Sequence, residues 1–350
     1  MNIPSHWQLC MSNIIAEYMV NQFLETIGQP TRPTLALPNT SIPLSAVCEA
    51  DQIALGLNEI GTNEAREKAL KERFPVEKDE ELVCEPTLLL DQTGVIIAWH
   101  LPGVLSEEFQ VDCVRNLEFL FPDISRSITS SRSWRTQEDL FTESQIRGAI
   151  ELPPAWYQKG QVVRQILVHH VEQILTLIAL QAPAQAGALK NAILSATLMV
   201  MDPDIYASGR ETFLKVAGST QDEDMQQIIP EWPTVYLVVL VIANWVTPFH
   251  GDLSFQVQWL DLLATIGGDP DLHIELENLG VRLAYSPGTV VGLSREVLQH
   301  GVLASVLDQA FLAYHMRDNV QEGVGVHRCD WVKQGELPIL LQRFALSMTN

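Results

Sequence analysis

Three histidines in this chain are each followed two residues later by a carboxylate, a spacing that can bind a metal ion. The pairs are His170 with Glu172, His250 with Asp252, and His273 with Glu275. A mononuclear iron site that keeps positions open for further ligands typically uses two imidazoles and one carboxylate. On an extended strand, residues i and i+2 point to the same side, so such a pair can bind one ion there.

The first pair falls within a predicted helix and not on a strand. Residues 161–181 place Leu167, Val171 and Ile174 at helical spacing, which is typical of a buried amphipathic helix. In a helix, residues two apart diverge by about 200°, so His170 and Glu172 cannot face one ion. We therefore interpret this pair as part of a helix surface.

The other two pairs differ in their distance from His300, the last histidine that could complete the site. His273 lies only 27 residues before His300, which leaves little room for the strands of a barrel. His250 follows the most apolar strand in the chain and lies 50 residues before His300. That separation is long enough for four or five strands of about five residues with their turns. The spacing therefore predicts His250, Asp252 and His300 as the metal ligands and the catalytic centre. Taken on its own, the His250 pair is better explained as an ordinary strand-end histidine, and the later His300 and Arg317 favour the metal site.

An arginine follows the last histidine at a position where it could bind an anionic co-substrate. Arg317 comes 17 residues after His300, at the end of the predicted strand FLAYHMRD. The remote carboxylate of a dicarboxylate needs a cationic partner, and the arginine fork offers two parallel hydrogen bonds. The ordered set of His-x-Asp, then His, then Arg is more specific than any of its members.

The elements that must position these residues change in type along the chain. Two apolar runs within 87–105 flank a turn at 91–94, which predicts a hairpin, and a helix is expected over 107–121 with Pro122 ending it. Two further helices are expected, over 185–201 and 209–217, with Asp202-Pro203 ending the first. From Trp232 onward, short β-branched runs between turn residues predict an all-β sandwich or barrel packed on those helices, an α+β fold.

The domain organisation follows from the same change of pattern. Residues 1–85 form a predicted N-terminal extension, partly irregular and rich in Pro, Thr and Ser in one stretch. Residues 86–350 form the predicted catalytic domain, in which 86–230 supply supporting strands and helices and 231–350 supply the β core with the metal site.

Charge and cysteine content restrict the class of protein. With 22 Lys and Arg against 43 Asp and Glu, the formal net charge is −21, which disfavours long-range attraction to nucleic acid and anionic membranes. The five cysteines are scattered without a CxxC pair, so a reducing intracellular setting is expected, in the nucleus or the cytoplasm. No signal peptide is predicted, and the longest apolar stretch, 235–246, is too short to span a bilayer.

The segments WPTVYLVVLVIANWVTPFHGD, LGVRLAYSPGTVVGLSREVLQHGV and AYHMRDNVQEGVGV resemble a group of basidiomycete fungal Fe(II)/2-oxoglutarate dioxygenases related to the TET/JBP oxygenases. The resemblance implies a double-stranded β-helix (jelly-roll) core, with Fe(II), 2-oxoglutarate and O2 as cofactor and co-substrates. It implies His250, Asp252 and His300 as iron ligands, Arg317 at the distal carboxylate of 2-oxoglutarate, and Asn244 on the substrate side. From its residue type alone, Asn244 equally suits a turn.

Three functions follow as alternatives. The resemblance implies hydroxylation of a C–H bond in a methyl group on a nucleobase, with modified nucleic acid as a partner. An oxygenase acting on a small molecule or a protein side chain is favoured by the acidic balance, because residues 231–350 contain 6 Lys and Arg against 13 Asp and Glu. A non-catalytic β-barrel module is the third alternative, and the intact set of four residues argues against it.

Overall fold

The computed structural model describes residues 40–43, 68, 72, 82–118, 120–128, 137–154, 186–220, 225–226, 229, 232, 234–251, 256–277 and 279–348. Several predicted features lie outside these residues, namely the helix over 161–181, the pair His170 and Glu172, and Asp252. Within the described part of the chain, no helix combines the length and the apolar character needed to cross a membrane.

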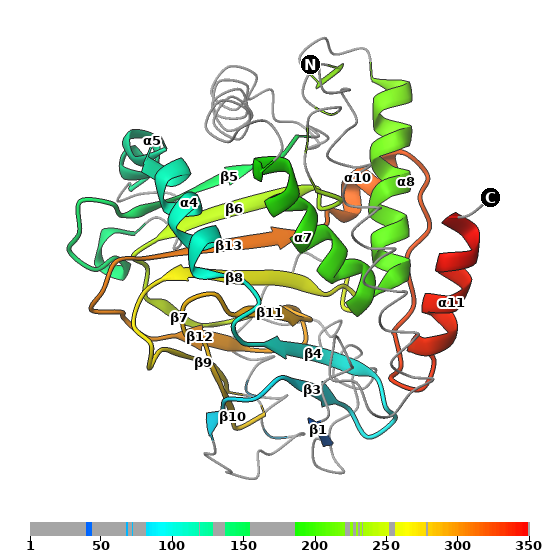
Figure 1. Ribbon diagram of the computed structural model, residues 1–350, viewed down its shortest axis with the longest axis horizontal. Helices are drawn as coiled ribbons and strands as arrows, with labels where there is room; N and C mark the ends of the chain where they lie inside the picture. The colour runs from blue at the N-terminus through cyan, green and yellow to red at the C-terminus, as the bar shows by residue number, and fades with distance from the viewer. Residues whose placement is uncertain are drawn as a thin grey trace.

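Two β-sheets and several helices make up the fold, so the predicted mixture of helix and sheet is confirmed (Figure 1). The larger sheet has the order β1 (Thr40–Pro43), β3 (Thr87–Leu90), β4 (Ile96–Leu101), β11 (Val290–Leu293), β8 (Asp261–Gly267), β13 (Gln309–His315), β6 (Val238–Ala243), β5 (Gly148–Leu152). The smaller sheet has the order β2 (Leu82–Val83), β10 (Val281–Ala284), β9 (His273–Leu276), β12 (His300–Val302), β7 (Thr247–His250). The predicted extension thus contributes β1 and β2, each at an edge.

The larger sheet is covered on both faces, which explains why its central strands are apolar throughout. On β8, Leu262, Ala264 and Ile266 belong to a core shared with the helices, whereas Leu263 belongs to a second core shared with the smaller sheet. This alternation follows from the two-residue period of a strand. The two sheets therefore pack face to face, and the helices cover the outer face of the larger one.

The helices are α4 (Glu107–Glu118), α5 (Phe121–Arg126), α7 (Ala186–Met201), α8 (Pro203–Ser219), α10 (Asp318–Gly323) and α11 (Leu337–Met348), with a 3-10 turn η2 at Glu138–Leu140. In Figure 1, α4 and α7 cross in front of the strands of the larger sheet, and α8 runs beside α7. The helices predicted over 107–121, 185–201 and 209–217 are present, but two of their boundaries differ.

Both differences involve proline. Pro122 was expected to end a helix, yet α4 already ends at Glu118 and Pro122 lies in the first turn of α5. Pro203 does follow the end of α7, and it also begins α8 six residues before the expected start at Gly209. Proline fits a first helical turn because the backbone N–H that it lacks would have no partner within the helix there.

The predicted hairpin of β3 and β4 is confirmed, with antiparallel pairing between the two strands. The Asp91 carboxylate organises its turn by accepting hydrogen bonds from the backbone N–H groups of Thr93 and Val95, both at 2.8 Å. Gly94 has a φ of 82°, a left-handed conformation that glycine adopts without steric cost. Local turn chemistry therefore accounts for this hairpin.

A buried carboxylate caps the N-terminus of α8. Asp202, at the junction of α7 and α8, accepts a hydrogen bond from the backbone N–H of Ile205 at 2.9 Å, as an N-cap residue does. Burial is the main cause that raises the pKa of this carboxyl group from 3.8 to about 8. The folded protein therefore holds Asp202 protonated over a pH range in which the unfolded chain ionises it.

We predict that Asp202 makes the protein less stable as the pH rises. A raised folded-state pKa gives a stabilising contribution that is complete below about pH 4 and is lost as the pH rises through about 8. As the pH rises from 4 to 8, the free energy of unfolding of the native chain should fall relative to that of Asp202→Asn. The fall should be at most about 1.4 kcal/mol per pH unit. Urea unfolding of both proteins between pH 4 and 8 measures this, and parallel pH profiles would contradict it.

Candidate metal and co-substrate site

Two predicted metal ligands face each other across neighbouring strands of the smaller sheet. His250 ends β7 and His300 begins β12, and the antiparallel register places the two residues directly opposite each other. Their ring centroids are 4.4 Å apart, with 47° between the ring planes. Residues that are opposite in an antiparallel pair place their side chains on the same face of the sheet. The two imidazoles are therefore brought together by strand pairing, although 50 residues separate them in the sequence.

Each ring is oriented by its own backbone in the same way. The Nδ1 atom of His250 lies 2.9 Å from the carbonyl oxygen of Pro248, and Nδ1 of His300 lies 3.0 Å from that of Leu298. A carbonyl oxygen can only accept, so Nδ1 must be the protonated nitrogen in both bonds. In the neutral rings, Nε2 then carries the lone pair that can bind a metal ion. This backbone bond is a usual support of metal-binding histidines.

A glycine allows the two strands to approach closely at this point. A Cβ atom added to Gly301 would lie 3.0 Å from Cδ1 of Phe249 and 3.1 Å from the carbonyl oxygen of Thr247. Both contacts are tighter than nine in ten real Cβ contacts, so a larger residue would have to displace its neighbours by a few tenths of an ångström. Glycine after His300 lets β12 pair with β7 without such a shift.

The two histidines line a pocket between the sheets. The pocket holds about 460 Å³ of space outside the protein atoms, part of it open to solvent. Its wall is mostly apolar, and its lining residues are Leu240, Ile242, Trp245, Thr247, His250, Leu263, Tyr285, Arg295, His300, Val302, Phe311 and Ala313. The Trp245 ring meets His250 edge-on, with centroids 6.2 Å apart. A few polar groups in an apolar hollow are typical of a small-molecule site.

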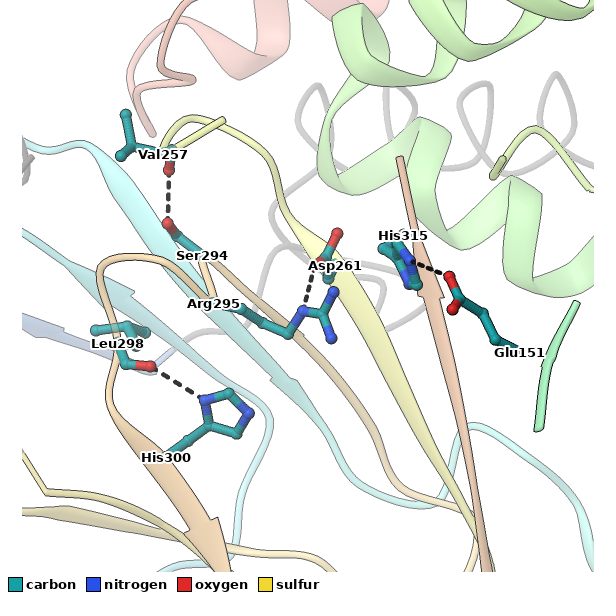
Figure 2. Close-up of polar contacts among 8 residues, drawn as sticks. All are labelled: Glu151, Val257, Asp261, Ser294, Arg295, Leu298, His300 and His315. Carbon is teal, nitrogen blue, oxygen red and sulfur yellow. Dashed lines mark hydrogen bonds and ion pairs between the residues drawn. The ribbon is translucent and has the colours of Figure 1, made fainter. Parts of the chain in front are cut away.

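Arg295 is the cationic residue among the described residues that line this pocket. It lies in the turn between β11 and β12, and only 6% of its surface is exposed. Its Nε donates to Oδ2 of Asp261, the buried first residue of β8 (Figure 2). Figure 2 places the Arg295 side chain between the His300 ring and Asp261. The pocket therefore has a fixed positive group close to its histidines.

The predicted third ligand, Asp252, lies outside the described residues, so its position relative to the two rings stays a prediction. The residue before it is placed, however. A Cβ atom on Gly251 would lie 3.6 Å from the carbonyl oxygen of Arg295 and 3.7 Å from that of Glu296. Gly251 therefore lies beside the turn that carries Arg295. Among the residues that the structure describes, no group of three potential metal ligands comes together.

The two residues present fit an iron site in type and orientation. Imidazole suits Fe(II), and two rings on adjacent strands supply the histidine part of a site with two His and one carboxylate. The predicted carboxylate, Asp252, comes two residues after the end of β7 in the sequence, and its part in the site stays a prediction.

Arg317, the predicted partner of 2-oxoglutarate, lies elsewhere. It is the N-cap residue of α10, two residues beyond β13, and its Nη2 pairs with Oε1 of Glu151 on β5. His315 Nε2 lies 3.8 Å from the same carboxylate oxygen. Arg317 is largely buried, and burial lowers the pKa of its guanidinium. It is not among the described residues that line the histidine pocket.

Asn244 forms the corner between β6 and β7. Its φ is 55°, a left-handed conformation that asparagine tolerates better than most residues. Its amide nitrogen donates to the Ile146 carbonyl oxygen at 2.7 Å and to Asp308 Oδ1 at 2.9 Å, and its amide oxygen accepts from the Gln309 backbone N–H at 2.9 Å. These contacts are those of a turn residue. Asn244 is not among the described residues of the histidine pocket, so its substrate role stays a prediction.

The competing pair, His273 and Glu275, is on strand β9, as expected. Its members contact each other, with 3.0 Å between His273 Nε2 and Glu275 Oε1. In the antiparallel pairing of β9 with β10, His273 lies opposite Ala284 and Glu275 lies opposite Arg282. No further carboxylate, thiol or imidazole among the described residues joins them to complete a group of three.

Residue patterns alone did not identify Asp261, Arg295 and Trp245 as parts of this site. One signal was available, because Asp261 stands within the apolar run WLDLLATIG. A carboxylate in a buried strand requires a charged or hydrogen-bonding partner. The identity of that partner depends on the pairing of β8 with β11, which the order of residues does not reveal.

Comparison with known proteins finds a likeness in structure but none in sequence. The sequence matches no protein-family model and no curated protein. Among solved structures, the chain is similar to NgTET1 in complex with 5mC DNA, with a TM-score of 0.42 and 13% sequence identity. The match covers 78% of this chain and 93% of that chain. A likeness at this TM-score does not by itself assign an activity to this chain.

We predict that His250 and His300 are required for divalent metal binding. His250→Ala and His300→Ala should each weaken binding of Fe(II) or Zn(II) by more than the roughly 10- to 100-fold that loss of an outer-shell partner costs. Anaerobic metal titration of the purified chain measures this. His273→Ala is the matched control and should bind metal like the native chain. Equal loss in His273→Ala, with His250→Ala unaffected, would move the site to the competing pair.

Proposed function

We propose that the chain is an Fe(II)- and 2-oxoglutarate-dependent dioxygenase of the TET/JBP type, built on a double-stranded β-helix core. The observation that supports this most directly is the pair His250 and His300, opposed across β7 and β12 with both Nδ1 atoms bound to backbone carbonyls. Asp252 would complete the iron site. The relation to basidiomycete fungal members of the group remains a prediction from sequence.

The iron would supply the oxidising chemistry, activating O2 with 2-oxoglutarate for hydroxylation of a substrate C–H bond. The residues of this chain have simpler tasks. His250 and His300 present their Nε2 atoms in a fixed orientation, because the backbone bonds at Nδ1 hold both rings. The apolar wall, which includes Trp245, Leu263 and Phe311, excludes water from the site.

Turnover of 2-oxoglutarate tests the proposal without knowledge of the substrate. The native chain, loaded with Fe(II), should release succinate slowly without substrate and faster with a true substrate. A panel should include methylated DNA in single-stranded and duplex form, free modified bases, small molecules and peptides. The same measurement on His250→Ala should give no release above the level without protein.

The outcome also separates the alternatives. Metal binding without any succinate release would favour the non-catalytic module. Release stimulated by a small molecule or peptide, and not by any nucleic acid, would favour the second alternative. Absence of metal binding in the native chain would contradict the proposal as a whole.

The described charges favour a substrate other than intact duplex DNA. Three of the six basic residues in 231–350 are paired with carboxylates, Arg295 with Asp261, Arg317 with Glu151, and Arg328 with Asp318 and Glu322. Basic residues upstream of this segment could also supply a phosphate-binding groove, but one of them, Arg147, lies 2.8 Å from Glu138. The others considered, Arg132, Arg135, Lys159 and Arg164, lie outside the described residues. Paired cations bind phosphates less readily, because each must give up its carboxylate.

We therefore predict weak binding to duplex DNA, with a dissociation constant of about 1 μM or higher at physiological salt. If a base is oxidised, a single-stranded or free base should be preferred, since base extrusion needs backbone contacts. Fluorescence anisotropy with methylated duplex and single strands, at several salt concentrations, measures this. Tight and steeply salt-dependent duplex binding, with substrate-stimulated succinate release, would contradict the prediction.

A further inference from the structure

We propose that Arg295, held in place by Asp261, is the residue that binds the distal carboxylate of the co-substrate in this pocket, in place of Arg317. This inference rests on the proposed function, because it names a ligand group beside the same two histidines. It differs from the expectation drawn from sequence order, which assigned that role to the arginine after β13.

The first observation is position. Arg295 lines the pocket together with His250 and His300, and the turn that carries it leads directly into β12. Ser294, one residue earlier, fixes this turn by donating from Oγ to the carbonyl oxygen of Val257 at 2.5 Å (Figure 2). The backbone N–H of Leu298 closes the turn on the carbonyl oxygen of Ser294 at 2.9 Å. A single short segment therefore positions both the cation and one metal-binding ring.

The second observation is chemical. A guanidinium has five N–H donors arranged along more than one edge, so a bond from Nε to Asp261 does not by itself prevent it from binding a second carboxylate. Asp261 orients the side chain and lowers the cost of burying its charge. The rest of the pocket wall is largely apolar, which suits the methylene carbons of a short dicarboxylate. A 2-oxo acid bound near the histidines would then extend its far carboxylate toward Arg295.

The third observation concerns the alternative residue. Arg317 pairs with Glu151, which also lies near His315, and this cluster belongs to β5 and the end of β13. Arg317 is not among the described residues of the pocket, whereas Arg295 lines it together with both histidines. A ligand in the apolar hollow beside the histidines therefore meets Arg295 and not Arg317.

The test compares two ligands that differ only in the distal carboxylate, 2-oxoglutarate and 2-oxopentanoate. Binding to the Zn(II)-loaded chain is measured by calorimetry, so that no turnover is needed. The native chain should bind 2-oxoglutarate roughly 10- to 100-fold more tightly than 2-oxopentanoate, because a charge-assisted hydrogen bond contributes about that much to binding. Arg295→Gln should reduce this preference to near one, whereas Arg317→Gln should retain it. Arg328→Gln, at an exposed ion pair, is the matched control and should also retain it.

Loss of the buried cation could unfold the chain by leaving Asp261 without a charged partner. The double variant Asp261→Asn with Arg295→Gln removes both charges and should fold, with the same loss of preference. Unchanged preference in a folded Arg295 variant, or its loss in Arg317→Gln alone, would overturn the inference. So would a native chain that binds Zn(II) but does not distinguish the two ligands. A native chain that binds no Zn(II) would instead contradict the proposed function itself.

Discussion

The antiparallel pairing of β7 with β12 is the interaction on which the candidate site depends. It places His250 opposite His300, and each ring is held through Nδ1 by the carbonyl oxygen two residues earlier, that of Pro248 or Leu298. A slip of one residue would turn one histidine to the other face of the sheet, because side chains alternate along a strand. Gly301 permits the close approach, and the turn before β12 adds Arg295 to the same pocket. Register, and not a local motif, therefore creates the constellation.

The sequence predicted the elements of this fold better than their connections in space. The hairpin at 91–94 was predictable because Asp91 and Gly94 determine its turn locally. The helix boundaries at Pro122 and Pro203 were less predictable, since proline disfavours a helix interior but suits a first turn, and only tertiary packing decides between the two. The order of strands within each sheet depends on contacts between residues far apart in sequence, which periodicity does not encode.

The same division applies to the candidate site. His250 and His300 were identified from spacing, because the number of residues between two ligands limits how many strands can separate them. Arg317 was chosen by order along the chain, and order does not reveal that Glu151, 166 residues earlier, lies beside it. Arg295 was not identified from the sequence, in which an arginine in a turn does not differ from a solvated one. Its burial follows only from the pairing of β11 with β8, which brings Asp261 within reach.

The buried charges also connect the site to the acidic character of the whole chain. Arg295 and Arg317 are each largely buried against a carboxylate, Asp261 and Glu151 respectively, so neither arginine brings an uncompensated charge into the fold, although the chain carries −21. A ligand that brings its own negative charge into this interior must share an arginine with a carboxylate already present. A small dicarboxylate can do so when a metal ion neutralises its other end. A polyanion such as duplex DNA would have to be bound at the surface, where the net charge of the chain opposes it.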